Sequence, residues 1–79
     1  MATIYTVKRE HLIREAKQIE RDAEQSLRAW IILGQSNKYS AAMNAVRALR
    51  AAAAEPSVKI RREILRNSGF TVETPRAAA

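Results

Sequence analysis

The sequence predicts an all-α fold, an antiparallel helical hairpin (a long first helix and a second helix) followed by a short third helix. Three observations lead to this prediction. Apolar residues recur at alternating steps of three and four through two long segments, which is the spacing of one helix face. Gly34 separates these two segments, and Pro56 separates the second from a third. A glycine commonly ends a helix, and a proline suits the first turn of a new one.

The first helix is expected over residues 8–33. Its inward positions follow a heptad pattern, at Leu12, Ala16, Ile19, Ala23, Ser26, Trp30 and Leu33. The second helix is expected over residues 38–54, with Ser36 or Asn37 as its N-cap. Its inward positions are Tyr39, Ala42, Val46, Leu49 and Ala53. The linker is short, so the two helices should fold back on each other.

The register of the hairpin can also be predicted. If Leu33 lies beside Lys38, the numbers of facing residues sum to about 71. Trp30 then faces Ala41 and Ala42, so a large side chain meets small ones, as interdigitated packing requires.

The third helix is expected over residues 56–67, with Ile60, Ile64 and Leu65 directed inward. Residues 3–7 and 70–72 are rich in β-branched and aromatic side chains, so a minor two-stranded pairing of the termini is compatible with the sequence. The domain organisation that follows is an extended lead-in over residues 1–7, one helical domain over 8–70, and a C-terminal tail over 71–79.

Self-association is expected because 79 residues make a small domain, which buries only ~60–65% of the surface of its unfolded chain. The predicted first helix is ~39 Å long and the second ~26 Å. Either the third helix or a second copy must therefore cover the start of the first helix. Residues 29–33 are apolar on every side and also need cover. The expected homodimer interface comprises Leu12, Ile13, Ala16, Trp30 and Ile31.

Positive charge is concentrated in the second half of the chain. Residues 35–79 carry eight Lys or Arg and three Glu, a net of +5 out of a total of +6. The predicted third helix has Ile60 and Ile64 on one side and basic residues on the opposite side. A basic side of this kind suits contact with phosphates. The candidate nucleic-acid-binding residues are Lys59, Arg61, Arg62 and Arg66, extended by Arg47 and Arg50 on the second helix. A solvated surface is the simpler interpretation of the same residues. The Ala-Glu-Pro-Ser turn lacks the glycine that is frequent in helix-turn-helix motifs, so it favours a basic helix without that motif.

The leading functional hypothesis is therefore a small basic, self-associating protein that binds nucleic acid through its C-terminal half, as a regulator or accessory factor. The alternative is a non-catalytic inhibitor or adaptor, of the kind that phages and mobile elements encode, which docks on an acidic surface of a host protein complex. A structural subunit of a larger assembly is a third hypothesis.

No enzymatic activity, metal or cofactor is expected, because the chain has no cysteine, one histidine (His11, expected to be solvated) and no glycine-rich phosphate loop. No segment approaches the ~20 apolar residues of a membrane span, so no membrane partner is expected. The N-terminus lacks a signal-peptide pattern, and the expected location is cytoplasmic.

Overall fold

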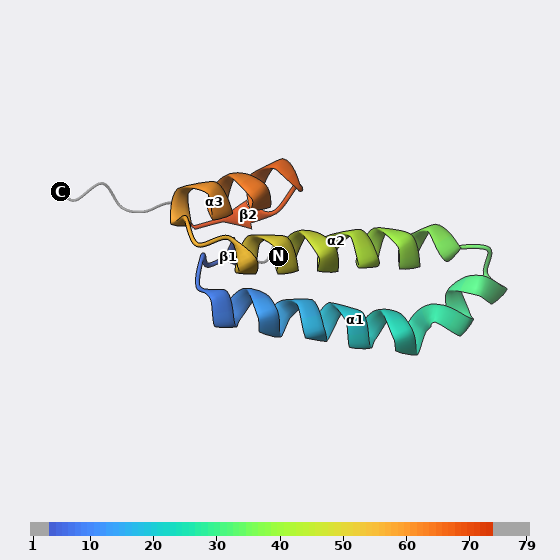
Figure 1. The fold of residues 1–79 in the computed structure, drawn as a ribbon. Coiled ribbons are helices and arrows are strands. Elements are labelled where there is room, and N and C mark those ends of the chain that lie inside the picture. The colour runs from blue at the N-terminus through green and yellow to red at the C-terminus, as the bar shows by residue number, and fades with distance from the viewer. Residues whose placement is uncertain (1–3, 74–79) are drawn as a thin grey trace.

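A computed structural model describes residues 4–73 (Figure 1). Its elements are β1 (Ile4–Tyr5), α1 (Arg9–Ile32), α2 (Ser36–Ala54), α3 (Val58–Asn67) and β2 (Thr71–Val72). Helices α1 and α2 lie antiparallel along most of their length, and α3 packs beside the C-terminal part of α2. The predicted fold class is confirmed, including the pairing of the two terminal segments. Residues 74–79 of the expected tail lie outside the described part of the chain.

The turn of the hairpin is tighter than the sequence predicted. Gly34 has a φ of +68°, the left-handed conformation that the expected helix end requires. The backbone N–H of Gln35 donates to the carbonyl of Trp30 at 2.6 Å, which closes the turn. Ser36 and Asn37 were predicted to precede the second helix, but both already belong to α2. The N-cap residue is Gln35, which makes no side-chain capping bond.

The register agrees with the prediction. Arg50 of α2 forms an ion pair with Glu20 of α1 at 2.9 Å, and these numbers sum to 70, against the expected 71. Ala23, Val46 and Leu49 are buried along the contact between the helices, as expected of the two apolar stripes.

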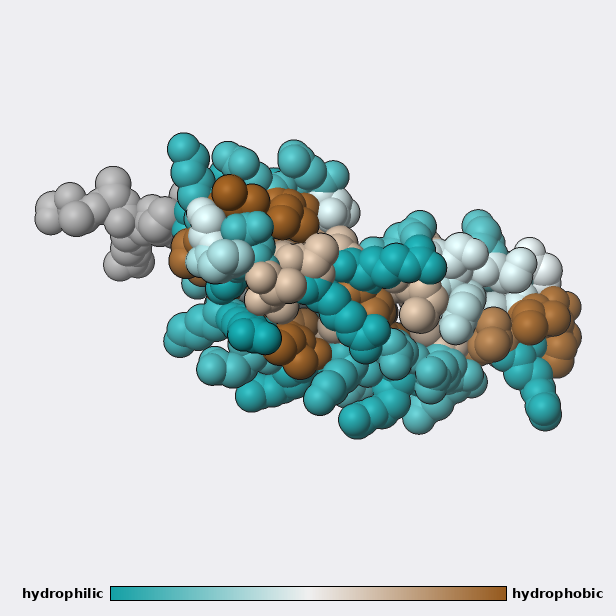
Figure 2. Space-filling model, viewed as in Figure 1, coloured by the Kyte–Doolittle hydropathy of each residue, from teal (hydrophilic) through white to brown (hydrophobic). Residues whose placement is uncertain are grey.

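The molecule is elongated. Its radius of gyration is 14.1 Å, against about 12 Å for a compact domain of this length. One end of the hairpin, the hairpin base, is where α1 begins, α2 ends and α3 packs; the other end, the hairpin tip, comprises residues 28–38 around the turn (Figure 1). Figure 2 shows hydrophobic residues gathered at the outermost part of the tip. Within residues 4–73, no helix combines the length and the apolar character that crossing a membrane requires.

Helix α3 contacts the rest of the protein through a narrow face. Ser57 caps the helix by accepting a hydrogen bond from the N–H of Ile60 at 3.4 Å. Leu65 is fully buried, and Ile64 packs against the core. The prediction that Ile60 points inward is wrong, because its side chain is 44% exposed. Since an α-helix turns by ~100° per residue, Ile60 lies about 140° around the helix from Leu65, whereas Arg61 lies only about 40° away. Arg61 therefore takes the position that the sequence suggested for an apolar residue.

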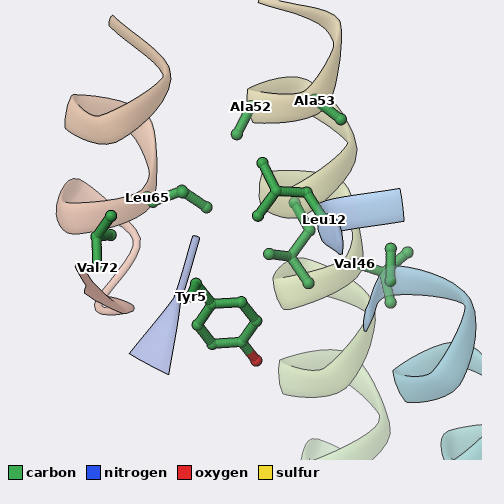
Figure 3. Packing of buried hydrophobic residues seen from close by; sticks show 9 residues of the cluster. Tyr5, Leu12, Val46, Ala52, Ala53, Leu65 and Val72 are labelled. Carbon is green, nitrogen blue, oxygen red and sulfur yellow. The ribbon is translucent and has the colours of Figure 1, made fainter. Parts of the chain in front are cut away.

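The chain itself covers the start of α1. Strands β1 and β2 pair in parallel, with Tyr5 beside Val72, and both of these side chains are buried. The Tyr5 ring also meets the Phe70 ring edge to face, with 4.9 Å between the centroids. These residues join Leu12 and Leu65 in one core at the hairpin base (Figure 3). This core includes Tyr5 and Val72, which lie outside the residues 8–70 expected for the helical domain.

Candidate nucleic-acid interface and the hairpin tip

Net charge divides between the helices. Helix α1 carries five Lys or Arg and five Asp or Glu, a net of zero. Helices α2 and α3 with the residues between them, 36–67, carry seven Lys or Arg and two Glu, a net of +5. Within residues 4–73, the pair between Arg50 and Glu20 is the only salt bridge. The cations of α2 and α3 are therefore almost entirely uncompensated by carboxylates of the same chain.

Lys59 and Arg66 are the exposed cations of α3. They are seven residues apart, which is close to two full turns, so they share one face at ~10 Å along the axis. Glu63 is also exposed and lies only about 40° around the helix from Lys59. The exposed face of α3 thus holds two positive charges with one negative charge between them.

Arg61 has a structural position that the sequence prediction did not anticipate. Its guanidinium donates from Nε to the carbonyl of Ala52 at 2.9 Å and from Nη1 to the carbonyl of Val7 at 2.6 Å. Two further hydrogen bonds reach the carbonyl of Glu55. The side chain joins the end of α2, the turn before α3 and the segment after β1. Because its donors are directed into the protein, Arg61 is not placed to contact a phosphate, and its assignment to the nucleic-acid site is corrected.

Arg62 is only partly available. Its side chain is half-buried, and its Nε is enclosed without a hydrogen-bond partner in the described part of the chain. Of the four basic residues that the sequence placed on the binding face of α3, the structure leaves only Lys59 and Arg66 exposed.

The two basic residues of α2 lie on another face. Arg50 pairs with Glu20, and Arg47 donates to the side-chain oxygen of Asn44 at 2.8 Å. Ala52 points toward α3 (Figure 3). Arg50 lies about 160° around α2 from Ala52, and Arg47 lies about 140° from it. The six predicted residues therefore do not form one continuous surface.

The residues predicted for the dimer interface lie in two separate places, the hairpin base and the hairpin tip. Leu12 and Ala16 are buried within the chain, so they are not available to a partner, and Ile13 packs partly against the same core. Of the two remaining residues, Trp30 is half-buried and Ile31 is 60% exposed. The homodimer is therefore not supported by its expected contacts at the base.

The largest exposed apolar side chains of the tip were only partly anticipated. Ile32 is 76% exposed and Leu33 is 67% exposed, although Leu33 was predicted to face the second helix. Leu33 lies just beyond α1, where the chain turns away toward Gly34. The signal in the sequence was the run 29–33, which is apolar on all sides and which one neighbouring helix cannot cover.

Two titratable groups at the base lie close together. The rings of Tyr5 and His11 meet edge to face at 5.9 Å. Burial raises the pKa of Tyr5, and the negative charge of Glu15 adds to the effect. His11 is half-buried and its Nε2 has no partner in the described structure, so it is less solvated than predicted. Residues 4–73 enclose no pocket and bring together no group of three metal-ligating side chains.

Comparisons of this chain with protein-family models, with curated proteins and with solved structures found no match.

Proposed function

We propose that this protein binds nucleic acid through the phosphate backbone, with the exposed face of α3 that carries Lys59 and Arg66 toward the ligand. The observation that supports the proposal is the division of charge: α1 is neutral, while residues 36–67 carry a net of +5 with a single intramolecular ion pair among the described residues. Uncompensated cations of this kind release counterions from a polyanion when they bind it, which drives association without reading the sequence.

The geometry of α3 favours phosphate contact over base recognition. A recognition helix presents several side chains to base edges from one face. Here α3 has 10 residues, and it uses Leu65 and Arg61 to hold itself against the protein. Its exposed Lys59 and Arg66 can each reach a phosphate, but Glu63 between them would be repelled. Binding is therefore expected to be weak, indifferent to sequence and strongly dependent on salt.

The test is a fluorescence titration with duplex DNA between 50 and 200 mM salt, repeated with single-stranded RNA. Two phosphate contacts from Lys59 and Arg66 correspond to a log–log slope of about −2 per chain. Replacing both with Gln should remove most of that slope and leave the helical content unchanged, because both side chains are exposed.

The matched control replaces Arg14 and Lys17, two exposed cations of the neutral helix α1, with Gln. This control lowers the net charge equally and should change the slope by much less. The proposal is abandoned if neither nucleic acid binds at 50 mM salt, or if the control and the α3 variant lose affinity equally.

A further inference from the structure

The hairpin tip carries three consecutive exposed aliphatic residues: Ile31 (60%), Ile32 (76%) and Leu33 (67%). They lie at the end of α1 and in the turn, away from the core at the base, and Figure 2 shows hydrophobic surface at this end of the molecule. Trp30, half-buried, precedes them, and two exposed cations, Arg28 and Lys38, flank the group.

The directions of these side chains restrict what can cover them. At ~100° per residue, Ile31 and Ile32 point about 100° apart around the helix, and Leu33 lies beyond its end, where the chain turns away. A groove in a folded partner contacts a helix along one stripe of residues three and four apart. The hydrocarbon layer of a lipid bilayer can deform, so it can instead contact the side chains of the tip on several sides at once.

The size of the tip argues against a second copy as its occupant. Three partly exposed aliphatic side chains amount to a few hundred Å² of apolar surface. Two such convex ends facing each other bury less than the ~1,200 Å² in total that a stable interface requires.

The charge around the tip favours an anionic surface. The hairpin tip, residues 28–38, contains no Asp or Glu. The charged residues of the tip are Arg28 and Lys38, a net of +2. Basic residues beside an apolar insertion are attracted to anionic lipid headgroups, and tryptophan is common at the boundary between headgroups and acyl chains.

We infer that the hairpin tip docks on an anionic lipid bilayer. Ile31, Ile32 and Leu33 enter the boundary between headgroups and acyl chains, and Arg28 and Lys38 lie among the headgroups. Peripheral insertion of this kind needs no membrane span. It goes beyond the sequence-based expectation of no membrane partner, which considered spanning segments alone, and it does not depend on nucleic-acid binding at α3.

Trp30 is the only tryptophan of the chain, so it reports directly on the tip. The experiment mixes the full chain with vesicles of one part phosphatidylserine to three parts phosphatidylcholine, and with vesicles of phosphatidylcholine alone. Sedimentation measures binding, and lipids brominated on the acyl chains measure contact with Trp30. The expected result is binding to the anionic vesicles at low salt, with a blue shift of Trp30 emission and quenching by the brominated lipid.

Two variants test the two parts of the contact. Replacing Ile32 and Leu33 with Ser should weaken binding at least about 30-fold, since each buries most of an aliphatic side chain on insertion. Replacing Arg28 and Lys38 with Gln, which leaves the apolar residues in place, should weaken it about 25-fold. The matched control replaces Val58 and Ile60 of α3, which are 47% and 44% exposed, with Ser and should change binding less than about twofold.

Three results would overturn the inference. The first is no association with anionic vesicles at low salt. The second is binding that survives the Ile32 and Leu33 substitutions, or binding without quenching of Trp30, either of which would assign the contact to another basic surface. The third is a dimer, seen by light scattering, that the Ile32 and Leu33 substitutions dissociate; this would assign the tip to a second copy of the chain.

Discussion

Replacing Arg61 with Ala separates its role in the fold from a role in binding. In the structure, this side chain donates to the carbonyls of Val7, Ala52 and Glu55, and so connects three segments at the hairpin base. Alanine removes every one of these hydrogen bonds. Water can then hydrogen-bond to those carbonyls that lie near the surface, which offsets part of the lost stability. The stability that is not recovered comes from the charge-assisted hydrogen bonds and from the packing of the half-buried side chain.

The expected loss is about 2–4 kcal/mol in the free energy of unfolding, since hydrogen bonds to a charged group contribute ~1.5–3 kcal/mol each and do not add fully when they share one side chain. A domain of this length has a total stability of about 4–12 kcal/mol. The substitution should therefore remove a large part of the stability and lower Tm by roughly 10–30 °C.

The assay is urea unfolding followed by circular dichroism, with Arg61→Lys as the matched control. Lysine keeps the charge but cannot reach three carbonyls with one compact ammonium group, so its loss should be intermediate. Titration with duplex DNA, under conditions where Arg61→Ala remains folded, should give an unchanged salt slope. A shift of less than about 0.5 kcal/mol in stability, or a slope shallower by the ~0.9 of one phosphate contact, would refute the structural assignment.

Two further predictions concern the base. Replacing the fully buried Leu65 with Ala should cost about 2–5 kcal/mol by urea unfolding, whereas Ile60→Ala should cost less than about 1 kcal/mol because that side chain is 44% exposed; equal losses would contradict the packing of α3. The raised pKa of Tyr5, caused first by burial and then by Glu15, means that the folded state holds the phenolic proton more strongly. This contribution is therefore fully present below the ordinary pKa of 10.0 and is lost as the pH rises through the raised value. Urea midpoints at pH 9 and 11 should fall less in Tyr5→Phe than in the natural protein, and an identical fall in both would contradict this assignment.

The sequence predicted the features that depend on local periodicity. The stripes of α1 and α2, the left-handed Gly34 and the register of the hairpin follow from the spacing of apolar residues and the length of the turn, which are properties of neighbouring positions. The sequence did not determine which segment covers Leu12 and Ala16, and left two alternatives, the third helix or a second copy of the chain. The cover depends on contacts between β1, β2 and α3, which are distant in the sequence.

The error at Arg61 has a physical cause. A short basic helix looks the same in sequence whether its arginines face solvent or the carbonyls of other segments, because a long side chain can extend from the edge of a buried face. What decides the outcome here is the rotation of α3 about its axis. Leu65 fixes that rotation, and it places Arg61 inward and Ile60 outward. The spacing of residues within this short helix does not determine whether Ile60 or Arg61 faces the protein interior.

The same arrangement makes stability and the proposed functions separable. The largest fully buried side chains, Leu12, Leu49, Leu65 and Val46, contribute to a single core at or near the base. The exposed side chains of the tip contribute little to that core, so polar residues there should leave the unfolding free energy nearly unchanged. The exposed cations of α3 are likewise outside it. A loss of binding from substitutions at either surface can therefore be attributed to the contact itself, provided that unfolding by urea occurs at the same midpoint.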